Sequence, residues 1–338
     1  MDMKTRFIFF LTTFLLIMTV AHKAKSQIEI VNISEIAKIK SGTTYVLMKD
    51  PNSESVKDFI KVFKDSWTIS KLEFIKYSDF EKYLAPEDSF LTIGGYLTNT
   101  TGGHVTNVEF TKLYKLEKGG HHVYWPKTHI YLELWTCKEK YFQRTKKKKK
   151  KFTDRDKIRV ARIELFTDFE TIKDPAYIYQ SDYDGDGHIR NWGPGILKNY
   201  IQSLMVYLNN GEARSVFTGM NNPTEIKNLK KETLYVPDYV LIKFNKINGD
   251  ESKKLEEKEI FENYKLKYKI IPISELNEKI LNDTTAIYYL IYIKSVADKF
   301  INVINSLTGE IIYSRYSPVS YNIRSEDLEA LEKKILSD

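Results

Sequence analysis

The residues with the clearest chemical pattern form an Asp-Gly loop near the middle of the chain. Asp182, Asp184 and Asp186 alternate along it, and Gly187 follows directly. Alternating carboxylates can point their oxygens at one cation, and a glycine permits the sharp turn that such a loop needs. The carbonyl of His188 would add a fourth oxygen. These residues therefore predict a calcium site made by Asp182, Asp184, Asp186 and His188.

The loop resembles the first half of an EF-hand loop, in which Ile189 occupies the eighth place. It departs from that pattern at Arg190, where a small polar residue is usual, and at Gly193, where the bidentate Glu belongs. An Asp-Gly turn without metal therefore stays open as the other interpretation. A further carboxylate could come from nearby acidic residues, namely Asp168, Glu170 or Asp174.

A helix is expected directly after the loop. Pro194 suits its first turn and Asn209-Asn210-Gly211 its end. Its predicted buried stripe consists of Ile196, Leu197, Tyr200, Ile201, Leu204, Met205 and Leu208. We expect the ion to be structural and to hold the loop to this helix.

Catalytic signatures are absent from the sequence. It has no Gly-x-Ser-x-Gly elbow, no phosphate-binding Walker loop and no His-Glu-x-x-His helix. Four histidines, His104, His121, His122 and His129, fall in one strand-rich stretch. Adjacent strand residues point to opposite faces, so His121 and His122 cannot both reach one ion there. An alternative function, a secreted or envelope hydrolase, would assemble its site from residues 95–135.

Cys137 is the only cysteine, so the chain forms no internal disulfide. Its surroundings read as the end of a strand, which predicts a small packed side chain rather than a nucleophile.

The basic residues are concentrated in one place. The net charge is +7, but a run of six lysines begins at Lys146 and ends at Lys151. Proteins that bind nucleic acids usually have Lys and Arg spread over one face with aromatic residues between them, and this sequence lacks that pattern. The run is interpreted as a solvated hairpin loop, with contact to anionic surfaces as the other possibility. We expect no nucleic-acid partner.

Residues 1–26 have the features of a cleavable secretory signal peptide. Lys4 and Arg6 precede an apolar run of 15 residues, 7–21, which is shorter than the roughly 20 residues of a membrane-spanning helix. Ala24 and Ser26 supply small residues before a cut at Gln27. No later stretch is apolar enough to span a bilayer. An exported protein is expected, periplasmic or extracellular, and its composition is typical of bacteria.

Self-similarity predicts an internal duplication. Residues 44–49 match residues 238–243 at an offset of 194, and Lys71-Leu72 matches Lys265-Leu266 at the same offset. Each copy then reaches a third apolar run, 89–96 and 286–293. The strands expected in the first copy are 45–48, 72–75 and 90–96, and those in the second are 239–244, 266–271 and 286–293. Helices are expected between them, including a charged one over 251–262.

This order predicts an α/β fold, with α+β possible, made of two related strand-helix-strand-helix-strand units that antiparallel strands extend. The expected organisation is a signal peptide (1–26), a first unit with the Asp-Gly loop and helix (27–225), a second unit (226–318) and a C-terminal helix (319–338). The favoured function is a non-catalytic binding or interaction module for an unknown protein or surface ligand, with calcium as a structural ion.

Overall fold

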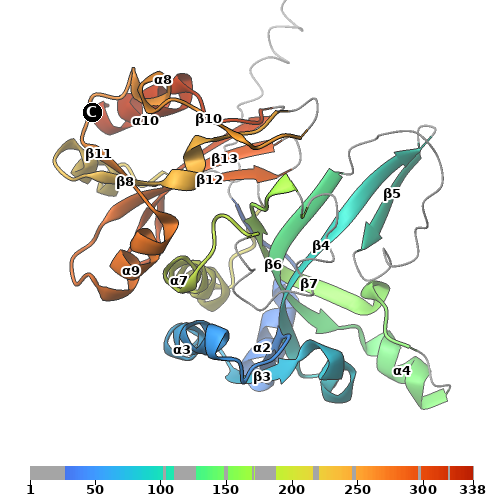
Figure 1. Ribbon diagram of the computed structural model, residues 1–338. Helices are drawn as coiled ribbons and strands as arrows, with labels where there is room; N and C mark the ends of the chain where they lie inside the picture. Colours follow the sequence, from blue (N-terminus) through green and yellow to red (C-terminus); the bar gives the residue numbers. More distant parts are fainter. Residues whose placement is uncertain are drawn as a thin grey trace, which may run out of the picture.

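The computed structural model describes residues 27–101, 104–109, 127–147, 151–169, 171, 188–215, 221–245, 249–295, 298–318 and 320–337. Within them the chain is a mixed α/β protein, which confirms the predicted fold class. The described part of the chain has two large sheets and one small two-stranded sheet, with helices between and around the two large ones (Figure 1). No helix in these ranges is both long and apolar enough to cross a membrane.

The first sheet has seven strands within the described residues, in the order β1-β7-β6-β4-β2-β3, with β5 paired to the far end of β4. The strand β2 is parallel to β3 and β4, and every other pair is antiparallel. The strands are β1 (Ile28–Ile30), β2 (Thr43–Met48), β3 (Lys71–Lys76), β4 (Ser89–Thr101), β5 (His104–Glu109), β6 (Lys127–Cys137) and β7 (Lys157–Leu165).

Among the residues that the structure describes, the second sheet has five strands in the order β11-β8-β12-β13-β14. Again the first strand in sequence is parallel to its two neighbours, and the remaining pairs are antiparallel. The strands are β8 (Leu234–Pro237), β11 (Tyr268–Ile271), β12 (Tyr288–Ser295), β13 (Asp298–Asn305) and β14 (Ile311–Pro318). A separate two-stranded sheet pairs β9 (Ile242–Lys243) with β10 (Lys253–Lys254).

The prediction of a strand over 239–244 is wrong for most of its length, because only Ile242–Lys243 lie in a strand, β9. Residues Asp238–Leu241 form a 3₁₀ turn, η8, and the strand lies just before it and ends at Pro237. Proline has no N–H to continue a ladder, so the chain leaves the sheet there. Tyr239 and Val240 are apolar because they are buried in the turn, not in a strand. A short apolar run does not separate these two cases.

The charged helix expected over 251–262 is also shorter than predicted. Only Glu257–Phe261 are helical, as α8, and β10 takes residues further upstream. The two sheets still share one strand order, β3-β2-β4-β6-β7 in the first and β11-β8-β12-β13-β14 in the second. Layered α/β units can reach a common order without common ancestry. The internal duplication therefore stays a prediction.

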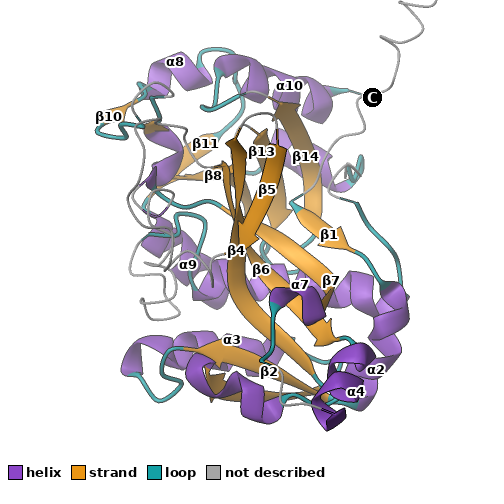
Figure 2. Ribbon diagram, turned by 90° about the vertical axis from the view of Figure 1, so that its right-hand side faces the viewer, coloured by secondary structure: helices purple, strands orange, loops and turns teal. Residues whose placement is uncertain are grey.

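The helices are α2 (Ile36–Ser41), α3 (Lys57–Ser66), α4 (Glu139–Lys147), α7 (Pro194–Asn210), α9 (Ile273–Asn282) and α10 (Ser325–Leu336), besides α8. Short 3₁₀ turns are η1 (Ile33–Glu35), η2 (Glu54–Val56), η3 (Tyr77–Tyr83), η5 (Asp154–Asp156) and η7 (Glu225–Lys230). The helix α7 lies between α3 and α9 (Figures 1 and 2) and contacts both. All seven residues of its predicted stripe are buried, as expected.

Glycine allows α7 to begin directly against α9. A Cβ on Gly195 would lie 2.4 Å from the carbonyl oxygen of Asn277, so no larger residue fits there. Gly193 has a φ of 142°, which favours glycine. The amide of Asn277 accepts a hydrogen bond from the Ile196 N–H (3.0 Å) and donates one to the Trp192 carbonyl (3.3 Å).

The middle of α7 is fixed to the second sheet by Asn199. Its amide donates to the Ser306 carbonyl (2.8 Å) and accepts from the Tyr289 hydroxyl (2.7 Å). Each of these buried polar atoms thereby gains a partner, which removes most of the cost of its burial. One apolar core therefore continues from the first sheet through α7 into the second.

The C-terminal helix α10 is held to the second sheet by a buried ion pair. The Lys299 ammonium contacts the Asp327 carboxylate, and both side chains are at most 5% exposed. The ammonium also donates to the Asn322 carbonyl (3.0 Å), and Arg315 Nε lies 3.3 Å from the same carboxylate.

We predict that Asp327→Asn lowers the free energy of unfolding by about 3–5 kcal/mol, because it leaves the Lys299 ammonium buried without its counter-charge. The double variant Lys299→Met/Asp327→Asn recovers much of that loss. Urea unfolding measures both. The control is Lys333→Met on the same helix, whose exposed ion pair with Glu329 contributes little. Equal losses in the single and double variants would contradict the expectation.

Candidate functional site

The first sheet has one face in the main core and a second face that carries polar and aromatic side chains. Along β6, Ile130, Leu132 and Leu134 enter the main core. The alternate residues lie opposite, as strand geometry requires. The second face is defined by Phe90, Thr92 and Gly94 of β4, by Tyr131, Glu133 and Trp135 of β6, and by Lys157, Arg159, Arg162 and Glu164 of β7, with Glu29 of β1.

A β-bulge makes the second face continuous along β7. The pairing with β6 shifts between Leu134 and Trp135, so that Leu134 lies opposite Ala161 and Trp135 opposite Arg159. Val160 is the extra residue, and it and Ala161 are both buried in the main core. The inserted residue changes the alternation of side chains along the strand. Arg159 and Arg162 therefore share a face, although a regular strand would place them on opposite sides.

One end of the second face is a cluster of aromatic rings. The ring of Trp135 stacks on that of Phe90, with centroids 4.5 Å apart, and on that of Phe152 at 5.4 Å. Phe80 of η3 meets the rings of Phe152 and Trp135 edge-on. Stacked and edge-on rings are the favoured arrangements of aromatic pairs. The rings thus form rigid apolar walls.

These walls enclose a cavity of about 700 Å³. Tyr77, Phe80, Trp135 and Phe152 line its apolar side, and the β4 stretch from Thr92 to Gly94 lines it as well. Charged residues also line it, namely Asp79, Glu81, Lys82, Lys151, Asp154 and Lys157. A concave, largely aromatic site with a few polar groups is typical of small-molecule binding sites.

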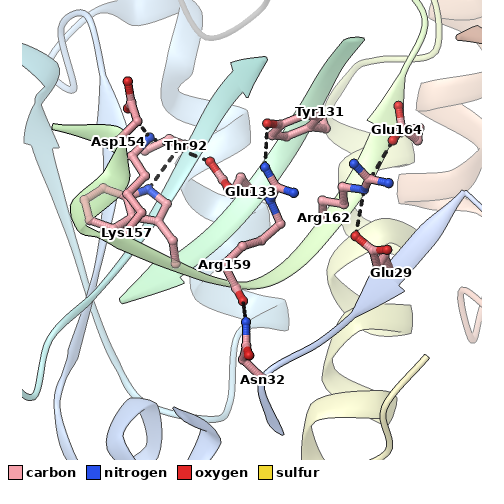
Figure 3. Close-up of polar contacts among 11 residues, drawn as sticks. Glu29, Asn32, Thr92, Tyr131, Glu133, Asp154, Lys157, Arg159, Arg162 and Glu164 are labelled. Carbon is pink, nitrogen blue, oxygen red and sulfur yellow. Dashed lines mark hydrogen bonds and ion pairs between the residues drawn. The ribbon is translucent and has the colours of Figure 1, made fainter. Parts of the chain in front are cut away.

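The Lys157 ammonium lies over the Trp135 ring. It is 5.0 Å from the ring centroid, 3.2 Å from Asp154 Oδ1 and 3.8 Å from Glu133 Oε2 (Figure 3). The Lys157 side chain is 22% exposed, whereas those of Asp154 and Glu133 are at most 10% exposed. The ammonium is therefore the member of this group that a ligand reaches most easily.

From Glu133 a row of paired charges continues across the second face. Arg159 donates to Glu133 Oε1 and to the Tyr131 hydroxyl, both at 2.8 Å. Arg162 Nε lies 2.9 Å from Glu29 Oε2 and 3.4 Å from Glu164 Oε1 (Figure 3). Burial raises the pKa of the Tyr131 hydroxyl above its ordinary value, so it stays protonated. The row has carboxylates and guanidinium groups in contact with one another, which makes their burial tolerable.

The row ends at His129, the one member of the predicted histidine group whose side chain is described. Its Nδ1 lies 3.1 Å from Ser295 Oγ and 3.9 Å from Glu164 Oε2. Burial alone would raise the pKa of Glu164, but the contacts with His129, Arg162 and Ser295 lower it below its ordinary value. A serine triad needs the serine and the acid on opposite ring nitrogens. Here both approach Nδ1, so these three residues lack the arrangement of a triad. Their contacts instead connect the first sheet, through His129 and Glu164, to Ser295 of the second.

The other residues of the histidine interpretation lie outside what is described: His121, His122 and the side chain of His104. Within the described residues, no three His, Cys, Asp or Glu side chains are grouped closely enough to hold a metal ion. Cys137 is the last residue of β6 and is fully buried, which confirms the packed role expected for it. Burial raises the pKa of its thiol to about 12, so it is not a thiolate at neutral pH.

Of the predicted calcium ligands, Asp182, Asp184 and Asp186 lie outside the described residues, and His188 lies within them. The His188 carbonyl accepts a hydrogen bond from the Asp168 N–H (3.0 Å), and its Nδ1 lies 2.7 Å from Asp168 Oδ2. Thr167 and Ile189 form an antiparallel bridge beside them. These contacts hold the two ends of the segment that contains the Asp-Gly loop against each other.

The lysine run differs from the expected hairpin loop. The helix α4 extends from Glu139 to Lys147, so the run begins in a helix. Residues 148–150 lie outside the described ranges, and Lys151 lines the cavity. The charge of the lysine run favours a solvated loop, but lysine is also a good helix former, and the helix α4 extends into the run.

A second buried lysine, Lys294 of β12, lies near the ends of the Asp-Gly segment. It is 4% exposed, and its ammonium is 3.4 Å from the Phe244 ring centroid and 5.7 Å from that of Phe166. Burial lowers the pKa of Lys294 from 10.5 to about 8, although the charge of Glu251 opposes the shift.

We predict that Lys294→Met raises the free energy of unfolding at pH 7 by about 1–3 kcal/mol, because the folded chain no longer holds a buried ammonium. From about pH 8 to about 10 the unfolded chain binds more protons at Lys294 than the folded chain does. The free energy of unfolding of the wild type therefore rises over this range, and its difference from that of the variant becomes smaller. Urea unfolding at several pH values measures the gap between them. Lys64→Met, at an exposed lysine over Phe74, is the control. A gap that does not narrow with rising pH would contradict the assignment.

Comparisons with known proteins do not indicate a function. No protein-family model matches this sequence, and neither curated proteins nor solved structures give a significant match. The function is therefore argued from the cavity and the second face alone.

Proposed function

We propose that this protein is a non-catalytic binding module whose ligand is a planar, partly apolar molecule with an anionic group. The observation that carries the proposal is the aromatic cavity with the Lys157 ammonium beside Trp135. Its volume of about 700 Å³ is within the range of small-molecule sites. The rings offer stacking surfaces, and Lys157 offers a charge-assisted hydrogen bond.

The chemistry of the lining supports binding rather than catalysis. Among the described lining residues there is no histidine or cysteine, and the charged groups nearest the tryptophan are paired with one another. A general base or nucleophile needs an activated group within reach of a substrate. The alternative, a hydrolase with a site in residues 95–135, has His129 as its described histidine, and that side chain contacts Ser295 between the sheets.

The proposal includes export and a structural calcium ion. Export is supported by the leader-like residues 1–26, with their basic start, apolar centre and small residues before Gln27. Calcium is supported by the three alternating aspartates and by the contacts of Asp168 with His188 at the ends of their segment. Weak calcium sites are filled in extracellular proteins, where calcium is millimolar.

The ligand class is tested with 1-anilinonaphthalene-8-sulfonate, a planar anion. We predict that it binds the folded protein and that Lys157→Met weakens binding by about 5–10-fold, the effect of losing one charge-assisted contact. Fluorescence titration measures the dissociation constant, and near-ultraviolet circular dichroism verifies the fold.

The matched control is Lys279→Met. Lys279 also lies over a ring, 5.2 Å from the Tyr235 centroid, and also pairs with a carboxylate, Asp283, but it lies outside the cavity. Its variant should bind the dye as the wild type does. Equal affinities for both variants, or no binding to folded protein, would refute the assigned site.

The calcium ion is tested by thermal unfolding. We predict that millimolar calcium raises the melting temperature of the wild type by about 2–5 °C and leaves Asp184→Ala unchanged. Asp65→Ala, which removes an exposed carboxylate paired with Lys61, should respond as the wild type does. If wild type and Asp184→Ala respond equally, the loop holds no calcium.

A further inference from the structure

Gln27 would be the first residue of the exported chain, and it is completely buried. The strand β1 begins at the next residue, Ile28. Gln27 has no exposed surface, and its carbonyl accepts a hydrogen bond from the Glu164 N–H (2.9 Å). Cleavage at the predicted site would therefore create a new chain terminus inside the folded structure.

The side chain of Gln27 has one well-formed hydrogen bond. Its Oε1 accepts from Asn302 Nδ2 (2.6 Å), between β1 and β13. Its Nε2 lies beside the Tyr200 hydroxyl, and this contact lowers the pKa of that hydroxyl against the larger effect of burial, but it falls short of good hydrogen-bond geometry. A buried donor with only a poor contact to its acceptor contributes less to stability than one that is fully hydrogen-bonded.

Cleavage would add a charge at the same place. The new α-amino group is protonated at neutral pH in water. Glu164 is hydrogen-bonded to Gln27 through its backbone N–H, but its carboxylate already contacts Arg162 and accepts a hydrogen bond from Ser295 (3.0 Å). A buried ammonium without its own counter-charge is costly, which favours any form of the terminus that is neutral.

We propose that Gln27 is a modification site, at which the exported chain cyclises to an N-terminal pyroglutamate. The neutral α-nitrogen attacks the side-chain amide carbon, a C–N bond forms, and the Nε2 group leaves as ammonia with the proton from the α-nitrogen. No other reactant is needed. The product loses the ammonium charge and the poorly matched Nε2 group, and it keeps the carbonyl oxygen of the former side chain.

This inference rests on the export part of the proposed function, and one measurement separates their outcomes. The intact mass of the protein purified from the exported fraction is compared with that of the chain 27–338. We expect a mass lower by one ammonia molecule and an N-terminus that pyroglutamyl aminopeptidase opens after unfolding. The uncyclised mass of 27–338 would overturn the inference and leave export intact. A retained leader or a different start would overturn both.

A variant tests the physical reason. Gln27→Asn keeps an amide but is one methylene too short to form the five-membered ring, so its terminus keeps the ammonium. We expect it to be exported with an unmodified N-terminus and to melt at a lower temperature than the wild type. Gln143→Asn shortens an exposed glutamine on α4 in the same way and should melt as the wild type does. Equal melting temperatures for Gln27→Asn and wild type would contradict the proposed advantage of the neutral terminus.

Discussion

The close approach of α7 to α9 is the contact on which the rest of the structure depends. Glycine at position 195 lets the two backbones meet. The Asn277 amide bonds the Ile196 N–H, one of the donors that the start of a helix leaves free, and the Trp192 carbonyl just before the helix. From that point the helix delivers apolar residues to both sheets along its whole length. The face of the first sheet that enters the main core is thereby covered, so the cavity and the row of charges lie on its second face.

The sequence could predict the features that arise from local pattern. The α/β class follows from alternating apolar runs, and the stripe of α7 follows from helical spacing. A glycine between two apolar runs is typical of a turn, and Gly309, which has a φ of 71°, lies in the turn that joins β13 to β14. The error at 239–244 has one cause, because Tyr239 and Val240 are as apolar in a buried turn as they would be in a strand.

The cavity could not be predicted, for a physical reason. Its walls come from η3, β4, β6 and the residues before β7, and no spacing in the sequence relates Phe80 to Phe152. Phe152 directly follows six lysines, and nothing in so charged a stretch predicts a buried ring. A buried helix can be predicted from the period of its apolar residues. A site that strand pairing assembles from distant segments leaves no such period in the sequence. Trp135 lies two residues before Cys137, in the stretch expected to end a strand, and its position alone does not indicate a cavity.

The second face combines rigidity with a neutral balance of charge. Its carboxylates and cations are matched along β6 and β7, so the sheet can bury them without neutralising any. The aromatic end depends on the same strands, because Trp135 stacks on Phe90 across the β4–β6 pair. A ligand in the cavity would therefore contact the β4–β6 part of the sheet, which has little freedom to move.

The bulge at Val160 has a consequence for how this protein can change over evolutionary time. Side chains alternate along a strand, and the bulge places one extra residue between Arg159 and Arg162 without moving either of them off the second face. If Val160 were deleted, Ala161 alone would separate the two arginines, and a regular strand would still place both of them, and Glu164, on that face. The row of charges can therefore accommodate the loss of one residue at this position as well as point substitutions, because the strand pairing on either side of the bulge is unchanged by it.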